Sequence, residues 1–245
     1  MISLLTFDSE EFPSLADLES TLRSHFQDLI EVTADEERAT LEVQIGTERA
    51  LVSPKRPSLP WGLLERPCKN AWYWPDAVSV MQRHTWHLVA VIKDSREKPV
   101  HRSLLLTRIT ACLGASLGYV GVYWDDATMV HSAADFTTAA AAADRANFPV
   151  KLWVNFRIVG NEDGSHTLFT TGLEPLGHME IEIPRSSRSA PELERWAYNV
   201  AHYLIKDEEQ IEDGETVGRS DTEKVRVRHV PSMFDSNRKV LFLEV

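Results

Sequence analysis

Residues 150–183 read VKLWVNFRIVGNEDGSHTLFTTGLEPLGHMEIEI and hold the clearest evidence for the fold. Apolar side chains alternate with other side chains over residues 150–158, which predicts a strand. The NEDG sequence at 161–164 is typical of a tight turn, and it leads into a second predicted strand over 166–171. A third alternating stretch covers 179–183. This segment therefore predicts an antiparallel hairpin followed by a further strand.

Helix-capping sequences occur on both sides of this hairpin. Ser14 is followed three residues later by Asp17, and Ser189 is followed by Glu192, so each pair predicts a capping box at the start of an amphipathic helix. Ser132 predicts the start of a third, shorter helix, and a largely buried helix is expected after Pro99. Strands are expected near residues 39–45, 50–52, 88–92 and 119–124.

The order of these elements mixes hairpins with single crossovers. That order predicts an α+β fold, in which helices pack on a mixed, mainly antiparallel sheet. Both halves begin strand–helix–strand, so two related β-α-β halves are compatible with the pattern. We expect one domain over residues 1–245, with 1–85 and 86–245 as its subdomains if it divides.

Composition favours a soluble cytoplasmic protein. The chain has 245 residues, 43% of them hydrophobic, and can bury a large core without metals or disulfides. Cys68 and Cys112 lie in no CxxC or zinc-binding spacing, which favours a reducing compartment. Residues 1–8 resemble a first strand more than a signal peptide. The longest uncharged run, 109–124, is shorter than the roughly 20 residues that span a membrane.

Charge is distributed unevenly along the chain. Residues 1–50 contain 12 acidic and 3 basic residues, a net charge of −9, whereas residues 51–110 have a net charge of +6 and the whole chain −11. The simpler interpretation is that the two segments lie side by side and neutralise each other. The alternative is an acidic surface that attracts a protein partner with a basic surface. Nucleic acid is disfavoured as a partner, because the overall field repels phosphate.

Four patches of sequence resemble a bacterial family, the domain of unknown function 4261. They are residues 74–77 with 84–89, residues 121–124 with 130–132 and Phe136, residues 171–182, and residues 213–218 with 223–229 and the terminal strand at 240–245. The resemblance extends over about residues 70–245 and is strongest in 170–245. It implies a soluble bacterial protein and carries over no reaction, cofactor or catalytic residue.

Polar residues with catalytic potential each have a structural interpretation that we favour. His84 and His87 have the spacing of two metal ligands on a helix, but no third ligand follows, so helix capping and backbone hydrogen bonding are favoured. Asp125 follows a predicted buried strand and is expected to be a turn residue. Glu180 and Glu182 fall on one face of a strand, as a carboxylate pair or as two solvated side chains, and we favour the second.

An aromatic and basic segment is the other candidate for binding. Tryptophans and prolines are concentrated over residues 54–86, which predicts an irregular cover over the core. We favour packing for these side chains, then a groove for a partner or ligand, and last a stacking surface for nucleic acid. The full set of candidate binding residues is Trp72, Trp74, His84, Tyr123, Trp124, Asp125, His131, Glu180 and Glu182.

No established catalytic motif is present in the sequence. The letters GASLG at 114–118 match a nucleophile elbow, but a predicted buried helix cannot provide the strand, turn and helix that the elbow requires. We therefore expect a non-enzymatic module that binds or neutralises another protein, with no metal and no cofactor. The alternative is a hydrolase with a cleft lined by Trp72, Trp74, Tyr123, Trp124 and nearby acids.

Overall fold

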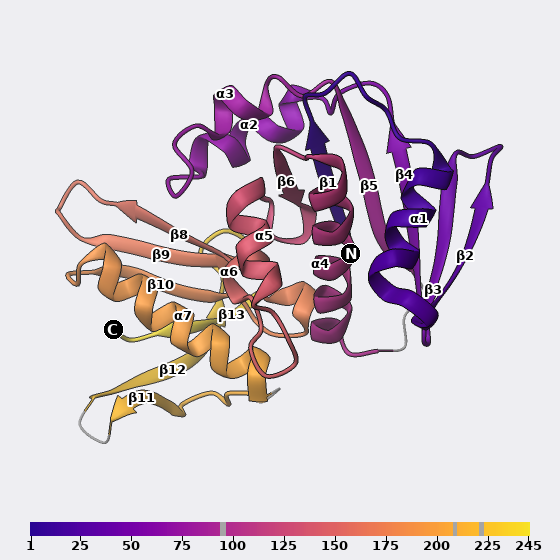
Figure 1. Ribbon diagram of the computed structural model, residues 1–245. Coiled ribbons are helices and arrows are strands. Elements are labelled where there is room, and N and C mark those ends of the chain that lie inside the picture. The colour runs from indigo at the N-terminus through magenta and orange to yellow at the C-terminus, as the bar shows by residue number, and fades with distance from the viewer. Residues whose placement is uncertain (94–96, 208–209, 221–222) are drawn as a thin grey trace. The chain divides into compact units, whose positions relative to one another are not determined.

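The computed structural model describes residues 1–93, 97–207, 210–220 and 223–245, and these residues form two compact units, Met1–Leu152 and Trp153–Val245. Each unit has its own sheet and its own helices (Figure 1). The sheets are mainly antiparallel, so the α+β prediction is confirmed.

Unit 1 is built on a sheet of seven strands in the order β2-β3-β4-β5-β1-β6-β7, with every neighbouring pair antiparallel. The strands are β1 (Ile2–Phe7), β2 (Ile30–Asp35), β3 (Thr40–Ile45), β4 (Glu48–Lys55), β5 (Trp86–Lys93), β6 (Gly121–Trp124) and β7 (Met129–Ser132). The helices are α1 (Leu15–Phe26), α2 (Trp61–Asn70), α3 (Ala77–Met81), α4 (Pro99–Leu117) and α5 (Ala133–Ala141), and α6 (Val150–Trp153) spans the boundary of the units. The short 3-10 helices of this unit are η1 (Gln27–Leu29) and η2 (Asp125–Ala127).

Helices cover both faces of this sheet, and the side chains of the interior strand β1 alternate between these two faces. Ser3 hydrogen-bonds Thr110 of α4 on one face, while Leu4 belongs to a core cluster with residues of α2 and α3 on the other. Thr6 faces the same side as Leu4 and donates a hydrogen bond to the sulfur of Met81. The strand is therefore covered on both sides.

Sequence signals for helix ends are confirmed in unit 1. The Ser14 hydroxyl accepts from the Asp17 amide at 3.2 Å, and the Asp17 carboxylate accepts from the Ser14 amide at 2.9 Å, which completes the capping box of α1. The amide of Asp135 donates to the Ser132 hydroxyl at the start of α5. Helix α4 begins at Pro99 and ends at Leu117, and the capping residue Gly118 that follows has a φ of 73°, which is favourable for glycine.

Unit 2 has a sheet of six strands in the order β11-β12-β13-β10-β9-β8, in which only the β10–β13 pair is parallel. The strands are β8 (Asn155–Gly160), β9 (His166–Thr171), β10 (Ile181–Ser186), β11 (Thr216–Ser220), β12 (Glu223–Pro231) and β13 (Lys239–Leu243). A 3-10 turn, η3 (Glu174–Leu176), precedes β10, and helix α7 (Ala190–Asp207) packs on β8, β9 and β10. At the start of α7 the Glu192 carboxylate accepts the Ser189 amide at 3.0 Å and the Ser189 hydroxyl at 2.6 Å, which is one half of the expected capping box, while the Glu192 amide donates to the Ser189 carbonyl.

Two elements differ from the sequence prediction. Residues 150–153 form a helical turn where a strand was expected, because Pro149 favours a helix start and its carbonyl accepts from the Leu152 amide at 2.8 Å. The segment after residue 60 was expected to be irregular, but Trp61–Asn70 is helical. Pro60 stands immediately before that helix, and Pro67 lies on its buried side.

The division into units falls at a different place from the expected subdomains. A boundary between residues 85 and 86 would cut the first sheet, since β5 is hydrogen-bonded to both β1 and β4. The contacts separate residues 1–152 from residues 153–245 instead. Whether the chain unfolds as one domain stays a prediction.

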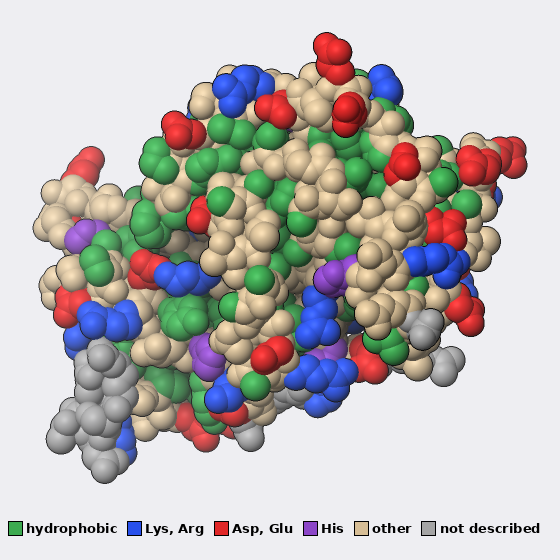
Figure 2. Space-filling view, viewed as in Figure 1, with side chains coloured by type: hydrophobic (Ala, Val, Ile, Leu, Met, Phe, Trp, Pro, Cys, Tyr) green, Lys and Arg blue, Asp and Glu red, His purple; other side chains and the backbone are tan. Residues whose placement is uncertain are grey.

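Charges of both signs are interspersed on the face of the molecule in Figure 2. In unit 1 the exposed Glu42 of β3 and Arg49 of β4 form one such pair, with 2.9 Å between their charged atoms. Both residues belong to the acidic segment 1–50, so this pair lies within that segment, and the neutralisation of that segment by the basic segment 51–110 stays a prediction. Among the described residues no helix is long and apolar enough to cross a membrane.

Candidate functional site

The aromatic candidates in unit 1 occupy different environments. Trp74 and Tyr123 are buried in the cluster that α2 and α3 form over the sheet, and Trp124 is 1% exposed beside Phe136. Trp72 is 66% exposed and contacts Tyr73 edge to face. Only Trp72 of this set is therefore available at the surface, while the other three rings fill the core.

The two candidate histidines of unit 1 are held in the interior by backbone hydrogen bonds. His84 accepts the Leu59 amide at Nε2, so its Nδ1 carries the proton and donates to the Met81 carbonyl. His131 donates from Nε2 to the Leu152 carbonyl at 3.1 Å. Burial lowers the pKa of both rings, to about 4 for His131. Both imidazoles are consequently neutral near pH 7.

Asp125 and Asp126 form the short turn η2 after β6, as expected of turn acids. The Asp125 carbonyl accepts the Thr128 amide at 2.9 Å. Burial raises the pKa of Tyr123 to about 12, and the neighbouring Asp125 carboxylate adds to that rise. Burial also raises the pKa of Asp126. The turn places Asp125 close to Tyr123 but brings no histidine of unit 1 into hydrogen-bond contact with it among the described residues.

Glu180 of unit 2 organises the loop that follows β9. Its carboxylate accepts the amides of Gly172, Leu173 and Glu174 at 2.8, 2.9 and 3.1 Å, and the hydroxyl of Thr170 at 2.7 Å. Burial raises the pKa of Glu180, while these four hydrogen bonds act in the opposite direction. The carboxylate is used to hold the loop in place.

Glu182 corrects the expectation of a solvated pair on one strand face. It is 4% exposed, and its carboxylate accepts the Ser232 hydroxyl and, at 3.0 Å, the Met233 amide. Strand β10 begins only at Ile181, so Glu180 precedes it and Met179 is half-buried, although Ile181 and Ile183 are buried as expected. The reason is long-range: the loop after β12 covers this face of the strand.

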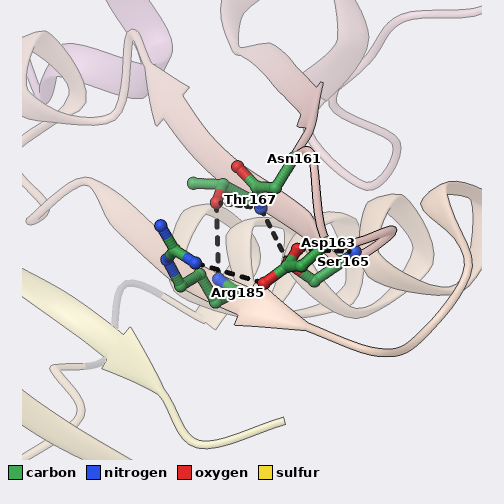
Figure 3. Close-up of polar contacts among 5 residues, drawn as sticks. All are labelled: Asn161, Asp163, Ser165, Thr167 and Arg185. Carbon is green, nitrogen blue, oxygen red and sulfur yellow. Dashed lines mark hydrogen bonds and ion pairs between the residues drawn. The ribbon is translucent and has the colours of Figure 1, made fainter.

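A polar cluster closes the β8–β9 hairpin (Figure 3). The Asp163 carboxylate accepts from Ser165 and, at 3.1 Å, from the guanidinium of Arg185, while the Asn161 amide donates to Ser165 and Thr167. The donors and acceptors of this cluster satisfy each other, and most of them are exposed. We interpret it as a rigid hairpin end.

A groove in unit 2 is a better candidate for binding. It has a volume of about 630 Å³ and lies between one flank of α7 and the segment that leads into β11. The flank is a single helical face, since its residues are spaced three and four apart. The lining residues are Trp196, Asn199, Val200 and Tyr203 of the helix, together with Ile211, Gly214, Glu215, Thr216, Val217 and Gly218.

This groove combines a buried apolar floor with an accessible rim. Trp196, Val200 and Ile211 are buried at its base, whereas Tyr203 is 43% exposed. Among the lining residues that the structure describes, Glu215 is acidic and none is a lysine or an arginine. An apolar cavity with few polar groups at its rim is typical of binding sites.

The part of the chain that contains this groove is also the part that matches a known family. Residues 169–244 match the family model described as Domain of unknown function (DUF4261), which confirms the resemblance for this last third of the chain. No curated protein and no solved structure matches the chain significantly. The matched residues hold Glu180, Glu182 and the whole groove.

Sequence reasoning did not identify the groove. The capping sequence at Ser189 predicts an amphipathic helix, but not that one flank of this helix, with Trp196 and Val200, lines a groove. The available signal was residues 213–218, one of the patches that resemble the family, which form the opposite wall. Their position beside α7 required the tertiary structure.

Proposed function

We propose that the protein is a non-enzymatic module of the bacterial cytoplasm that binds a protein partner with a basic surface. The observation that carries the proposal is the groove between α7 and β11. It offers an apolar floor, an exposed tyrosine and an acidic rim within the family-matched residues. Exposed aromatic side chains beside buried apolar contacts are typical of protein interfaces.

Electrostatics support a basic partner. Among the described residues between 207 and 215, Asp207, Glu212, Asp213 and Glu215 are acidic and none is basic, while Asp213 is paired with Arg228 of β12 at 3.7 Å. The acidic N-terminal fifth of the chain adds to the attraction at long range and increases the rate of encounter with a cationic protein. Two free cysteines, one buried and one partly buried, suit a reducing compartment.

The hydrogen bonds of the candidate acids and bases further support a binding role. His84, Glu180 and Glu182 each make two or more hydrogen bonds with the surrounding chain. A general acid or base has to exchange its proton with a substrate, which needs access to that substrate. These three groups serve to fix loops and turns.

Affinity capture with single-residue variants tests the proposal. Tyr203→Ala removes the exposed ring from the groove, and Val159→Ala is the matched control, because Val159 is 51% exposed on β8 of the same unit. We expect a basic protein that the native chain and the control retain from lysate of the native organism and that the Tyr203 variant loses. Thermal melting verifies that both variants are folded.

Two results would contradict this function. One is that Tyr203→Ala retains the same proteins in the same amounts as the control. The other is that no protein is retained while a small substrate is turned over, which would favour the hydrolase.

A further inference from the structure

Unit 1 has a groove of its own, which is larger than the groove of unit 2. It has a volume of about 930 Å³ and lies over α4, with α1 on one side and α5 on the other. Helix α4 contacts both of these neighbours (Figure 1). This α4 groove lies outside the family-matched residues, so a ligand here is independent of the proposed function.

Side chains on the floor of the α4 groove are small except at one end. The floor residues are three and four positions apart on α4, so they form a single face of the helix. Ala111, Cys112, Ala115 and Ser116 make up most of this face, and Arg108 stands at its N-terminal end. The floor is about 12 Å long at about 1.5 Å per residue. Its small side chains leave room for an apolar body, in a volume typical of small-molecule sites.

Helix α1 runs antiparallel to α4 along this floor. The Thr21 hydroxyl lies 3.1 Å from the Ser116 hydroxyl, while the Thr21 carbonyl accepts from the Cys112 thiol at 3.8 Å. Carbonyls of a helix point toward its C-terminus, so α1 advances from Ser116 toward the start of α4. His25 lies one turn after Thr21 and also lines the groove, which places it at the Arg108 end.

Hydrogen-bond donors meet at the Arg108 end of the groove. The Arg108 side chain is exposed, and no hydrogen bond or ion pair joins its guanidinium to the described part of the chain. His25 adds an N–H donor whether its ring is neutral or charged. Among the described lining residues none is an aspartate or a glutamate. A guanidinium and an imidazole together are suited to the oxygens of a carboxylate or a phosphate.

Carboxylates of the surrounding helices are engaged with their own segments. Helix α4 contains no acidic residue. The pairs in the described chain are Asp17 with Ser14, Glu19 with Arg23, Glu97 with His101, Asp135 with Ser132, and Asp144 with the amides of Ala146 and Asn147. The net charge of −11 repels anions at long range, but salt screens this field beyond about 8 Å. Contacts at the Arg108 end therefore decide whether an anion binds.

We propose that the α4 groove binds a small organic anion, with its carboxylate or phosphate at Arg108 and His25 and its apolar body over the alanines of α4. The planar guanidinium pairs with two oxygens of the anionic group, and the imidazole donates a further hydrogen bond. The body contacts Ala111 and Ala115 on the floor. A ligand therefore needs both parts to use the length of the groove.

A pair of variants with the same change of charge tests the anionic end. Arg108→Gln removes the guanidinium from the groove. Arg83→Gln is the matched control, because Arg83 is exposed after α3, and α3 packs on the opposite face of the sheet from α4. General attraction or repulsion between the protein and an anion is the same in both variants, so it cancels in the comparison.

Isothermal titration calorimetry with octanoate and octyl phosphate measures the affinity. Octylamine replaces the anion by a cation, and acetate lacks the apolar body. We expect the native chain and Arg83→Gln to bind both octyl anions equally, and Arg108→Gln to bind them at least about tenfold more weakly, which corresponds to the loss of a charged hydrogen bond. Octylamine and acetate should also bind at least about tenfold more weakly than octanoate.

Alkylation of Cys112 locates the bound ligand. Burial raises the pKa of both cysteine thiols to about 11, so iodoacetamide is applied at alkaline pH and each labelled peptide is followed by mass spectrometry. Octanoate should slow the labelling of Cys112 on the groove floor. Labelling of Cys68, which is 3% exposed in the cluster on the other face of the sheet, should not change.

Equal affinity of Arg108→Gln and Arg83→Gln for octanoate would overturn the anion site, as would binding of octylamine as tight as that of octanoate. Failure of the native chain to bind either octyl anion would overturn the ligand class. Binding that leaves the labelling of Cys112 unchanged would show that the anion occupies another surface. Each of these results leaves the capture experiment with Tyr203→Ala unaffected, so the two proposals fail separately.

Discussion

Replacement of Trp74 by alanine tests whether the tryptophan-rich segment is a core or a binding surface. Trp74 is 9% exposed and packs in the cluster that contains Leu4, Met81, Tyr123 and Val130. Its ring also occupies the space above Gly121, where an added Cβ would lie 2.9 Å from Cη2. The substitution therefore removes a ring that is enclosed on several sides.

The expected loss of stability follows from the area that the ring buries. A buried tryptophan removes roughly 150–250 Å² from water, worth about 4–6 kcal/mol at about 25 cal/mol per Å². The alanine side chain still buries part of this area, so the net loss is smaller. Substitutions of tryptophan by alanine in protein cores lower the free energy of unfolding by about 3–5 kcal/mol. For a protein of this size the Tm should fall by on the order of 10 °C.

Thermal and urea denaturation, followed by circular dichroism, measure the change. Trp72→Ala is the matched control, because that ring is two positions away and 66% exposed, so its loss should change stability by less than about 0.5 kcal/mol. Trp86→Ala should behave like Trp74→Ala, since Trp86 is 3% exposed and stacks on Phe7 with 3.8 Å between centroids. An unchanged melt for Trp74→Ala would refute the assignment of this ring to the core.

Three further predictions concern groups that the fold has buried. The pKa of His131 is about 4 in the folded protein, below its unfolded value of about 6.5. The neutral ring therefore contributes fully to folding stability above about pH 6.5, and this contribution is lost as the pH falls toward 4. Urea denaturation should show a loss of about 3 kcal/mol over this range that His131→Gln lacks, and parallel pH profiles would contradict it. Gly121→Ala places a methyl group 2.7 Å from the Met81 sulfur and should lower the free energy of unfolding by about 1–3 kcal/mol. The methyl group of Gly62→Ala meets nothing within 4 Å, so this control should be neutral or stabilising when both variants are compared by calorimetry. Glu182→Ala leaves the Met233 amide without its acceptor and should destabilise the protein by about 1–3 kcal/mol in chemical denaturation. Glu182→Gln keeps an acceptor oxygen and should destabilise it less. Equal losses of stability in the two variants would show that the acceptor is unimportant.

Local sequence determined the elements whose partners are near in the chain. The capping box at Ser14 and the hydrogen bonds between Ser189 and the Glu192 carboxylate join residues three apart, and the turn at 161–164 joins two consecutive strands. Such interactions depend on a few neighbouring side chains, and each of these predictions is confirmed. The α+β class followed as well, because hairpins and crossovers are visible in the order of elements.

The prediction from proline content was wrong for helix α2, which begins directly after one proline and contains another. Five prolines over residues 54–75 suggested an irregular cover. Pro60 instead stands at the start of α2, where its missing amide costs nothing, and Pro67 packs inward. Burial against the core outweighed the low helical propensity of this segment.

Tertiary structure alone decided which acids and histidines became inaccessible and which strand edge stayed open. The partners of Glu182 lie at Ser232 and Met233, about fifty residues further along the chain, and the acceptor for His131 lies at Leu152. No local pattern of residues indicates contacts at such separations. The groove has the same origin, since α7 and β11 enclose it only because the order of strands leaves β11 at the edge of the sheet. Sequence therefore determined most of the elements and the family resemblance of residues 169–244, whereas long-range packing determined where the groove lies.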